Sequence, residues 1–459
     1  MKKNRELIIL FIIVLLFGLY KIINVSFSYD TDVIILNPKY IMLSWIGLMR
    51  YGLTFIKYVL HLYGNVNIRL LNILTYVNVF IYSAVFLKFL SVDGKKNIWK
   101  DILTVMLVIT SPILLEQYNF TLQSVEVSFS MILMMISFIT TYKYLKDNKI
   151  GYACITILLL IVCFSTYQSF VNLYILGVLI SLYKLSSYDN KKNITRSIII
   201  FMISFILYYL IGKVIINIMN IDTTAYLTSK IGWLDSFKDT LFGIGKDFVK
   251  VLIGYGHVLN LGYLLCVIIV IGYIIKNKNI KSIYLLFMLL VPFLLNTLTG
   301  SRIVIRSLFT IPFLYSFIFY EFFDKKYVKY ILIVLIISQL INSYLLLIGD
   351  YHRYLNDISI GEKIYNDCGS NKDITIYIYG VEKSEENISL IKGEVMGYSY
   401  YEWFELGHPS YERIHNFMII HNIEYNIDND YNALSFDNEY PNNGYIIKEG
   451  NKCYVNLGD

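Results

Sequence analysis

The sequence predicts an all-α polytopic membrane protein with a small C-terminal α/β domain outside the membrane. Of its 459 residues, 56% are hydrophobic and only 16% are charged, whereas soluble domains average about 25% charged residues. The hydrophobic residues recur in blocks of roughly 18–25, the length that spans a bilayer. The loops between many of these blocks are rich in lysine, as cytoplasmic loops of membrane proteins are.

We interpret about eleven apolar blocks as transmembrane helices. Their approximate ranges are 6–25, 68–91, 101–116, 124–145, 150–166, 170–185, 196–221, 254–275, 280–298, 306–323 and 329–349. The third, fifth and sixth blocks are short, so we expect them to tilt or to end before the far surface.

Charge distribution predicts the orientation of these spans. The N-terminal segment has no small-x-small cleavage site after its apolar run, so we interpret it as a retained helix rather than a signal peptide. With the N-terminus in the cytoplasm, the inner loops are all rich in lysine, namely "SVDGKKNIWK", "KYLKDNK", "YKLSSYDNKKNITR", "IKNKNIKS" and "DKKYVK". The formal net charge of +6 therefore reflects membrane orientation and does not indicate nucleic-acid binding.

An odd number of spans places the C-terminal region outside. We expect a transmembrane domain at 1–349, with outer loops at 26–67 and 222–253, and an extracytoplasmic soluble domain at 350–459. Both outer loops contain stretches with the apolar spacing of an interfacial helix. The soluble domain begins as a helix, followed by a β-rich stretch, "DITIYIYG", and a hairpin in "YIIKEGNKCYV". In an oxidising compartment Cys368 and Cys453 can form a disulfide.

The first candidate functional residues are Asp30 and Asp32, in "SYDTD" directly after the first span. A carboxylate at this position can accept a proton from a sugar hydroxyl or hold a divalent cation. The alternative is a solvated loop with ordinary surface acids.

A second group lies in "SPILLEQYNFTLQSVEVSFSM", the turn between the third and fourth spans. Its candidate substrate-binding residues are Glu116, Tyr118, Gln123 and Glu126. Glu126 begins an apolar helix, where a charge usually faces a cavity or a partner. The alternative is a polar turn in which the helix dipole favours Glu126 near the N-terminus.

The turn "CFSTYQSFVN" between the fifth and sixth spans offers Tyr167 and Gln168. These uncharged polar groups suit hydrogen bonding to sugar hydroxyls, although a plain tight turn has the same composition.

Three arginines complete the candidate substrate-binding set. Arg302 and Arg306 are four residues apart in "SRIVIRS", and Arg50 follows the aspartate pair. The planar guanidinium donates two parallel hydrogen bonds to a phosphate. The alternative is anchoring to lipid phosphates at the membrane surface.

Taken in order, "SYDTD", "RYG" at 50–52, "SP…LEQYNFTLQS", "STYQS" and "SRIVIR" resemble the GtrII-type membrane glucosyltransferase family from residue 26 to about 310. The resemblance implies a GT-C fold in the bacterial cell membrane. It also implies transfer of a hexose, glucose in this family, from a polyprenyl-phosphate carrier to a cell-surface glycan on the outer face. Asp30 and Asp32 would then be the catalytic candidates, one as base and the other as orienter or cation holder.

The chain departs from the family pattern at Gln123, where an Asp is frequent, and in its C-terminal region. No cofactor is implied with certainty, and the need for a divalent cation stays open. The alternative functions are a transporter or flippase of lipid-linked saccharides, or a polymerase of such saccharides. A transporter predicts deep charged residues in several spans and an inverted repeat, and a polymerase predicts a large outer loop. Neither pattern is clear.

Overall fold

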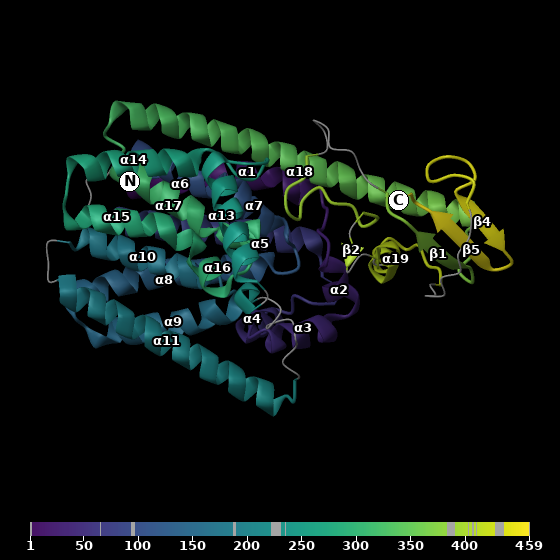
Figure 1. Cartoon of the computed structure of the whole chain (residues 1–459), viewed down its shortest axis with the longest axis horizontal. Helices are drawn as coiled ribbons and strands as arrows, with labels where there is room; N and C mark the ends of the chain where they lie inside the picture. The colour runs from purple at the N-terminus through teal and green to yellow at the C-terminus, as the bar shows by residue number, and fades with distance from the viewer. Residues whose placement is uncertain are drawn as a thin grey trace.

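The computed structural model describes residues 2–64, 66–92, 97–186, 190–221, 231–234, 236–382, 391–402, 404–405, 408–409, 411–426 and 436–458. Within these residues the chain is mostly helical, with a small sheet at its C-terminal end. Most of the longer helices lie side by side as a bundle, and the sheet projects from one end of it (Figure 1).

The bundle contains the predicted apolar blocks. Its helices are α1 (Lys2–Ile23), α5 (Ile68–Leu90), α6 (Ile98–Ile109), α7 (Pro112–Asn119), α8 (Ser124–Asp147), α9 (Ile150–Thr166), α10 (Phe170–Lys184), α11 (Asn190–Ile218), α13 (Phe237–Ile253), α14 (Gly262–Lys276), α15 (Ile280–Leu290), α16 (Leu294–Thr299), α17 (Thr310–Glu321) and α18 (Lys326–Cys368). Short 3₁₀ turns are η1 (Gly232–Leu234), η2 (Val291–Phe293) and η3 (Ile305–Leu308).

The predicted all-α membrane fold is confirmed, but fewer helices can cross a bilayer unaided. Among the described residues, six helices are long and apolar enough, or seven if the bent pair α6 and α7 counts as one span. The predicted spans at 150–166, 170–185 and 254–275 correspond to apolar helices of 17, 15 and 15 residues. The span predicted at 306–323 is a helix of 12 residues. By length, six or seven of the eleven predicted helices therefore qualify as full spans, and the other four are shorter helices.

The break between α6 and α7 is important for the site. The two helices meet at an angle of 52°, and Pro112 occupies the first turn of α7. Proline lacks a backbone N–H and disfavours a helical conformation in the preceding residue, so the first helix ends before it. As a result, α7 turns inside the bundle, and all of its residues are buried.

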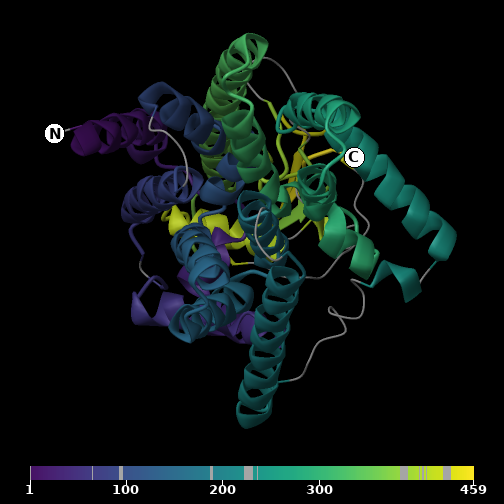
Figure 2. The same ribbon diagram turned by 90° about the vertical axis from the view of Figure 1, so that its left-hand side faces the viewer.

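The outer helices of the bundle expose apolar side chains. In α1 and α11, only 28% and 22% of the most apolar window is buried within the protein. Viewed along the bundle, both helices lie at its periphery (Figure 2). Exposed apolar surface on a membrane helix is expected to contact lipid.

Three short helices follow α1 at the end of the bundle that faces the sheet: α2 (Thr31–Leu36), α3 (Pro38–Gly47) and α4 (Tyr51–Val59) (Figure 1). The predicted interfacial helix at 50–63 corresponds to α4. Lys57, expected between its apolar positions, is buried, while Phe55 and Tyr58 are 65% and 61% exposed. The exposed surface of α4 is therefore more apolar than predicted, because Lys57 has a buried partner in Glu126.

The second predicted interfacial stretch contains α13, which exposes Phe237, Leu241 and Phe242 and buries Asp247. The preceding residues 222–230, and residue 235, lie outside the described residues.

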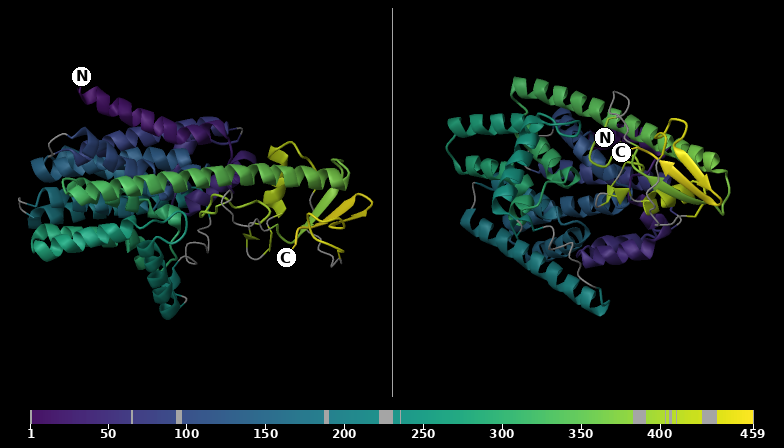
Figure 3. Two further views of the ribbon diagram at one scale, coloured as in Figure 1. Left: turned by 90° about the horizontal axis from the view of Figure 1, so that it is seen from above. Right: turned by 45° about the vertical axis from the view of Figure 1, so that its right-hand side comes forward.

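Helix α18 connects the bundle to the sheet. Its 43 residues extend over ~65 Å, about twice the thickness of the hydrocarbon core. The helix is continuous from one end of the bundle to the sheet (Figure 3), so the predicted boundary between residues 349 and 350 falls inside it. Its C-terminal end is joined to the sheet by a disulfide between Cys368 and Cys453.

The sheet contains β1 (Thr375–Tyr379), β4 (Ile446–Glu449) and β5 (Lys452–Asn456), in the order β1-β5-β4. β1 is parallel to β5, and β4 and β5 form an antiparallel pair, so the predicted strand and hairpin are confirmed. A two-residue pair, β2 (Phe404–Glu405) and β3 (His408–Pro409), precedes α19 (Tyr411–Ile420). Phe27 and Tyr29 contribute to the same core as the sheet and α19. The segment after α1 is therefore packed into what we call the C-terminal unit, the described residues from 369 to 458.

Candidate functional site

The aspartate pair lies between α1 and the C-terminal unit. Asp30 precedes α2 in a left-handed conformation with φ of 73°, and Asp32 is in the first turn of α2. One nitrogen of Arg413, Nη2, donates to Oδ1 of Asp30 and to Oδ1 of Asp32, each at 2.7 Å. Asn416 donates to Oδ2 of Asp32 at 3.2 Å. Two residues of α19 therefore fix the pair.

The two carboxylates differ in exposure. The Asp32 side chain is 0% exposed, whereas that of Asp30 is 36% exposed. Burial raises the pKa of Asp32, and Arg413 and Asn416 only partly oppose this. Asp32 is thus an enclosed group bound on both oxygens, while Asp30 keeps a surface on which another molecule can bind.

The arrangement does not favour a bridging metal ion. The Arg413 guanidinium already lies between the two carboxylates, where a cation shared by them would bind. The part of the chain that the structure describes contains no group of three or more His, Cys, Asp or Glu side chains placed to hold a metal.

Arg306 lies where three of the predicted segments meet. Its guanidinium is 4.6 Å from the centre of the Phe120 ring. Asp30, Glu116 and Tyr167 all act on it electrostatically. The first outer loop and the turns after α7 and α9 therefore contribute residues around this arginine.

Arg306 already binds a carboxylate of the C-terminal unit. Its Nη1 donates to Oε1 of Glu394 at 2.6 Å, and its backbone N–H donates to Oε2 at 2.8 Å. The Arg306 guanidinium and the backbone N–H thus each bind one oxygen of the carboxylate, and the same two donors can bind two oxygens of a phosphate. A carboxylate thus occupies the position that the sequence assigns to a phosphate.

Arg50 lies beside Tyr167 and Gln168, although the three were predicted from separate segments. Arg50 Nε donates to Oε1 of Gln168 at 3.1 Å, and the guanidinium lies 4.9 Å from the centre of the Tyr167 ring. Gln168 in turn donates to the Leu48 carbonyl. Gly52 allows this approach, because a Cβ there would lie 2.2 Å from Oγ of Ser165.

Glu116 binds backbone rather than open space. Its oxygens accept hydrogen bonds from the N–H groups of Glu394, Val395 and Met396 at 2.9, 2.8 and 3.3 Å. A Cβ on Gly393 would lie 1.7 Å from Oε1 of Glu116, so only glycine fits at this position. We call residues 391–397 the covering loop, because it lies over Glu116 and packs Val395 against α2, α3 and α4.

Three other predicted residues bind partners that belong to neither the aspartate pair nor Arg306. Glu126 lies 2.8 Å from Nζ of Lys57 in a buried pair, as expected for a charge at the start of an apolar helix. The Tyr118 hydroxyl is bonded to that of Tyr82 within the bundle. Arg302 binds Asp247 through two nitrogens, at 2.8 and 2.6 Å.

The carboxamides at the end of α7 and in the turn that follows it have few hydrogen-bond partners. Gln117, Asn119 and Gln123 are each 1% exposed. Both amide atoms of Gln117 and Asn119, and Oε1 of Gln123, have no hydrogen-bond partner in the described structure. Buried polar groups are nearly always paired, so this turn has unused hydrogen-bonding capacity.

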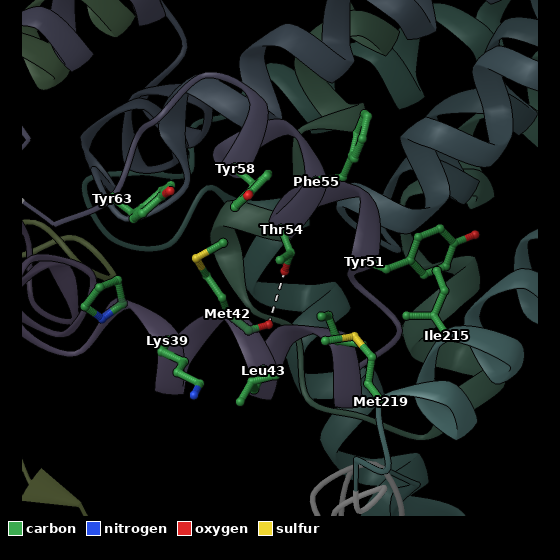
Figure 4. Close-up of a pocket in the computed structure, with 12 residues that line it drawn as sticks. Lys39, Met42, Leu43, Tyr51, Thr54, Phe55, Tyr58, Tyr63, Ile215 and Met219 are labelled. Atoms are coloured by element: carbon green, nitrogen blue, oxygen red, sulfur yellow. Dashed lines mark hydrogen bonds between the residues drawn. The ribbon is translucent and has the colours of Figure 1, made fainter.

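Beside Arg50, an apolar groove of about 600 Å³ opens between α3, α4 and the end of α11. Figure 4 shows Met42, Leu43, Phe55 and Met219 along it, with the Lys39 amine at its edge. A hydrogen bond of 3.2 Å from Thr54 to the Met42 carbonyl joins α3 to α4. Tyr51, which directly follows Arg50 in the chain, lines the groove.

Sequence reasoning missed Arg413, Asn416 and Glu394. The one available signal was the spacing of Arg413 and Asn416, which places them on the same side of a helix. Nothing local indicated that this helix would contact residues 380 positions earlier.

Comparison with known proteins identifies the membrane part of the chain. Comparison with curated proteins gives no match. The model of the family described as "Glucosyl transferase GtrII" matches residues 19–323, from within α1 to just beyond α17. That range includes the aspartate pair, the two turns and Arg306, and it excludes Glu394 and Arg413. The chain belongs to the GtrII glucosyl transferase family and is a membrane glycosyltransferase.

Proposed function

We propose that this protein transfers a hexose, glucose by family, from a polyprenyl-phosphate carrier to a cell-surface glycan on the outer face of the bacterial cell membrane. The proposal rests on one observation: the half-exposed carboxylate of Asp30 lies within electrostatic reach of Arg306. A base and a phosphate-binding cation are the two groups that this transfer needs.

In the proposed reaction, Asp30 accepts the proton of an acceptor hydroxyl as the oxygen attacks the anomeric carbon of the hexose. The bond between that carbon and the phosphate oxygen breaks, and its electrons pass to the phosphate. Arg306 binds the developing negative charge, and Arg50 lies nearby to bind the donor. Asp32 positions Arg413, which in turn positions Asp30.

The carrier lipid is assigned to the apolar groove. Its wall carries mostly hydrocarbon and aromatic side chains, among them Tyr51, the residue next to Arg50 in the chain. A polyprenyl chain in the groove would hold its phosphate near the arginines. Because the Glu394 carboxylate is bound to the Arg306 guanidinium in this structure, the phosphate must displace that carboxylate. The carboxamides of Gln117, Asn119 and Gln123 are available to bind sugar hydroxyls.

This assignment requires the aspartates and the C-terminal unit to lie outside the cell, as the lysine-rich loops predict. Polyprenyl-linked donors suit this side of the membrane, because nucleotide sugars remain in the cytosol.

The test uses cells that make a surface glycan. The gene is deleted and then restored as wild type, as Asp30→Asn, or as Asp239→Asn, an exposed aspartate on α13 that serves as control. We expect deletion to remove one hexose from the glycan by mass spectrometry, Asp239→Asn to restore it, and Asp30→Asn to fail at equal membrane abundance. Loss of the whole polymer on deletion would instead favour a flippase or polymerase.

A further inference from the structure

A second cavity, of about 640 Å³, is lined in part by Lys392 and Gly393 of the covering loop and shares no lining residue with the apolar groove. Three segments enclose it: the end of α13 with the loop that follows, residues 302–308, and residues 392–398. Its lining consists of Asp247, Lys250, Val251, Tyr255, Gly256, His257, Val258, Leu259, Arg302, Ile303, Ile305, Leu308, Lys392, Gly393 and Tyr398.

The cavity is strongly basic. Three basic residues line it, Lys250, Arg302 and Lys392, and Asp247 is the one carboxylate among its lining residues. Although burial alone would raise the pKa of Asp247, the hydrogen bonds from Arg302 and from the Ile303 N–H lower it, so Asp247 stays ionised. Because Asp247 pairs with Arg302 and Glu402 pairs with Lys392, the excess positive charge of the cavity comes from Lys250.

Each cation is held in place without being fully enclosed. Arg302 is fixed by Asp247, yet its side chain is 60% exposed. Lys392 is oriented by Glu402, which contacts it at 2.8 Å from outside the lining. Lys250 lies 5.6 Å from the centre of the Tyr255 ring. Fixed cations that still face open space can bind an anion at little entropic cost.

Aromatic rings stand beside these charges. Tyr255 is 63% exposed, and Tyr398 lines the side formed by the C-terminal unit. Flat aromatic faces stack on the C–H faces of sugars, and their hydroxyls bond to sugar hydroxyls. Basic and aromatic groups together suit a saccharide that carries negative charge.

The cavity is next to the proposed reaction centre. Ile305 and Gly393 line it, and they directly adjoin Arg306 and Glu394, which form the ion pair of the phosphate position. A molecule in this cavity would therefore lie next to that pair.

We infer that this cavity binds the acceptor, and that the acceptor is an anionic glycan bearing phosphodiester or carboxylate groups. The identification of the ligand as the acceptor rests on the proposed function, whereas the binding of an anionic glycan does not. Lys250, Arg302 and Lys392 bind the anionic groups, and Tyr255 stacks on a sugar ring.

The test is equilibrium binding to purified full-length protein in nanodiscs of phosphatidylcholine. The probes are a fluorescent oligo(glycerol phosphate) and a neutral glucose oligomer of equal length. Lys250→Gln is compared with Lys246→Gln, one turn earlier on α13 and exposed outside the cavity. We expect Lys250→Gln to weaken binding of the anionic probe roughly tenfold, as loss of a charged hydrogen bond does, and Lys246→Gln to leave it unchanged.

Equal binding of the neutral oligomer, or equal weakening by both lysine variants, would overturn the inference. So would loss of binding when phosphatidylglycerol is added at constant ionic strength, because the occupant would then be a lipid headgroup. Asp30→Asn separates the two proposals: it lies outside the cavity and should bind the probe normally while failing in transfer. Normal transfer by that variant would contradict the proposed function alone.

Discussion

Asp30 and Glu116 are both bound by the C-terminal part of the chain, but only one of them has an exposed surface. Arg413 contacts Asp30 at a single oxygen, and the side chain stays 36% exposed. Glu116 is fully buried and accepts three backbone hydrogen bonds from the covering loop. From the sequence, Asp30 was a catalytic candidate and Glu116 a candidate for substrate binding.

The difference separates a reactive carboxylate from a structural one. A general base must come within hydrogen-bond distance of the proton it removes, which the surroundings of Asp30 allow. A carboxylate saturated by consecutive backbone N–H groups can meet no substrate until those bonds break. We therefore assign Glu116 to holding the covering loop over the site.

The largest expected effect tests this division directly. Asp30→Asn should lower the turnover rate of purified protein by about 10²–10⁴-fold, the usual contribution of a general base, without lowering its melting temperature. Glu116→Gln should show the reverse pattern, with a loss of about 1–3 kcal/mol in the free energy of unfolding. If Glu116→Gln abolished turnover in a fully folded protein, the division would be wrong.

Gly393→Ala should be the next largest change. Its Cβ would lie 1.7 Å from Glu116 Oε1, and overpacking of this kind costs about 1–3 kcal/mol. The same substitution should cost less when Glu116 is already alanine, because the clashing oxygen is gone. Melting temperatures of the four proteins in this cycle, followed by intrinsic fluorescence, measure the coupling. A coupling energy of zero would show that the covering loop does not rest on Glu116.

These contrasts show what the sequence could predict. Hydropathy located the bundle helices, because apolar blocks and lysine-rich loops are local signals. The hairpin before Cys453 was equally local. Hydropathy also suggested a boundary at residue 350, where α18 leaves the apolar region, although the backbone helix continues to Cys368.

The partners of the candidate residues could not be found in this way. Arg413 contacts Asp30 across 383 positions, and Glu394 contacts Arg306 across 88. Such pairs depend on how α18 carries the C-terminal unit back over the end of the bundle. Similarly, nothing near Lys57 indicated that its amine would be buried against Glu126.

Glu394→Gln tests whether the C-terminal unit competes with the donor phosphate for Arg306. A neutral amide competes less well than a carboxylate for the Arg306 guanidinium, so the donor phosphate should displace it more easily. We expect KM for the lipid-linked donor to fall by roughly threefold to tenfold, with turnover changed less. Glu424→Gln is a matched control in the C-terminal unit, since its partner Lys372 is exposed and distant from the site. A rise in KM with Glu394→Gln would indicate that Glu394 helps to bind the donor.

The smallest expected effect concerns Asp32 and pH. Because burial raises its pKa in the folded protein, the folded state takes up a proton more readily than the unfolded chain. Stability linked to Asp32 is therefore greatest in acid and is lost as pH rises through the raised pKa. Wild-type protein should melt at a higher temperature, relative to Asp32→Asn, as pH is lowered from neutrality. If the difference between the two melting temperatures did not change with pH, Arg413 and Asn416 would fully offset the effect of burial on the pKa of Asp32. The contrast between an enclosed Asp32 and an open Asp30 would then rest on exposure alone.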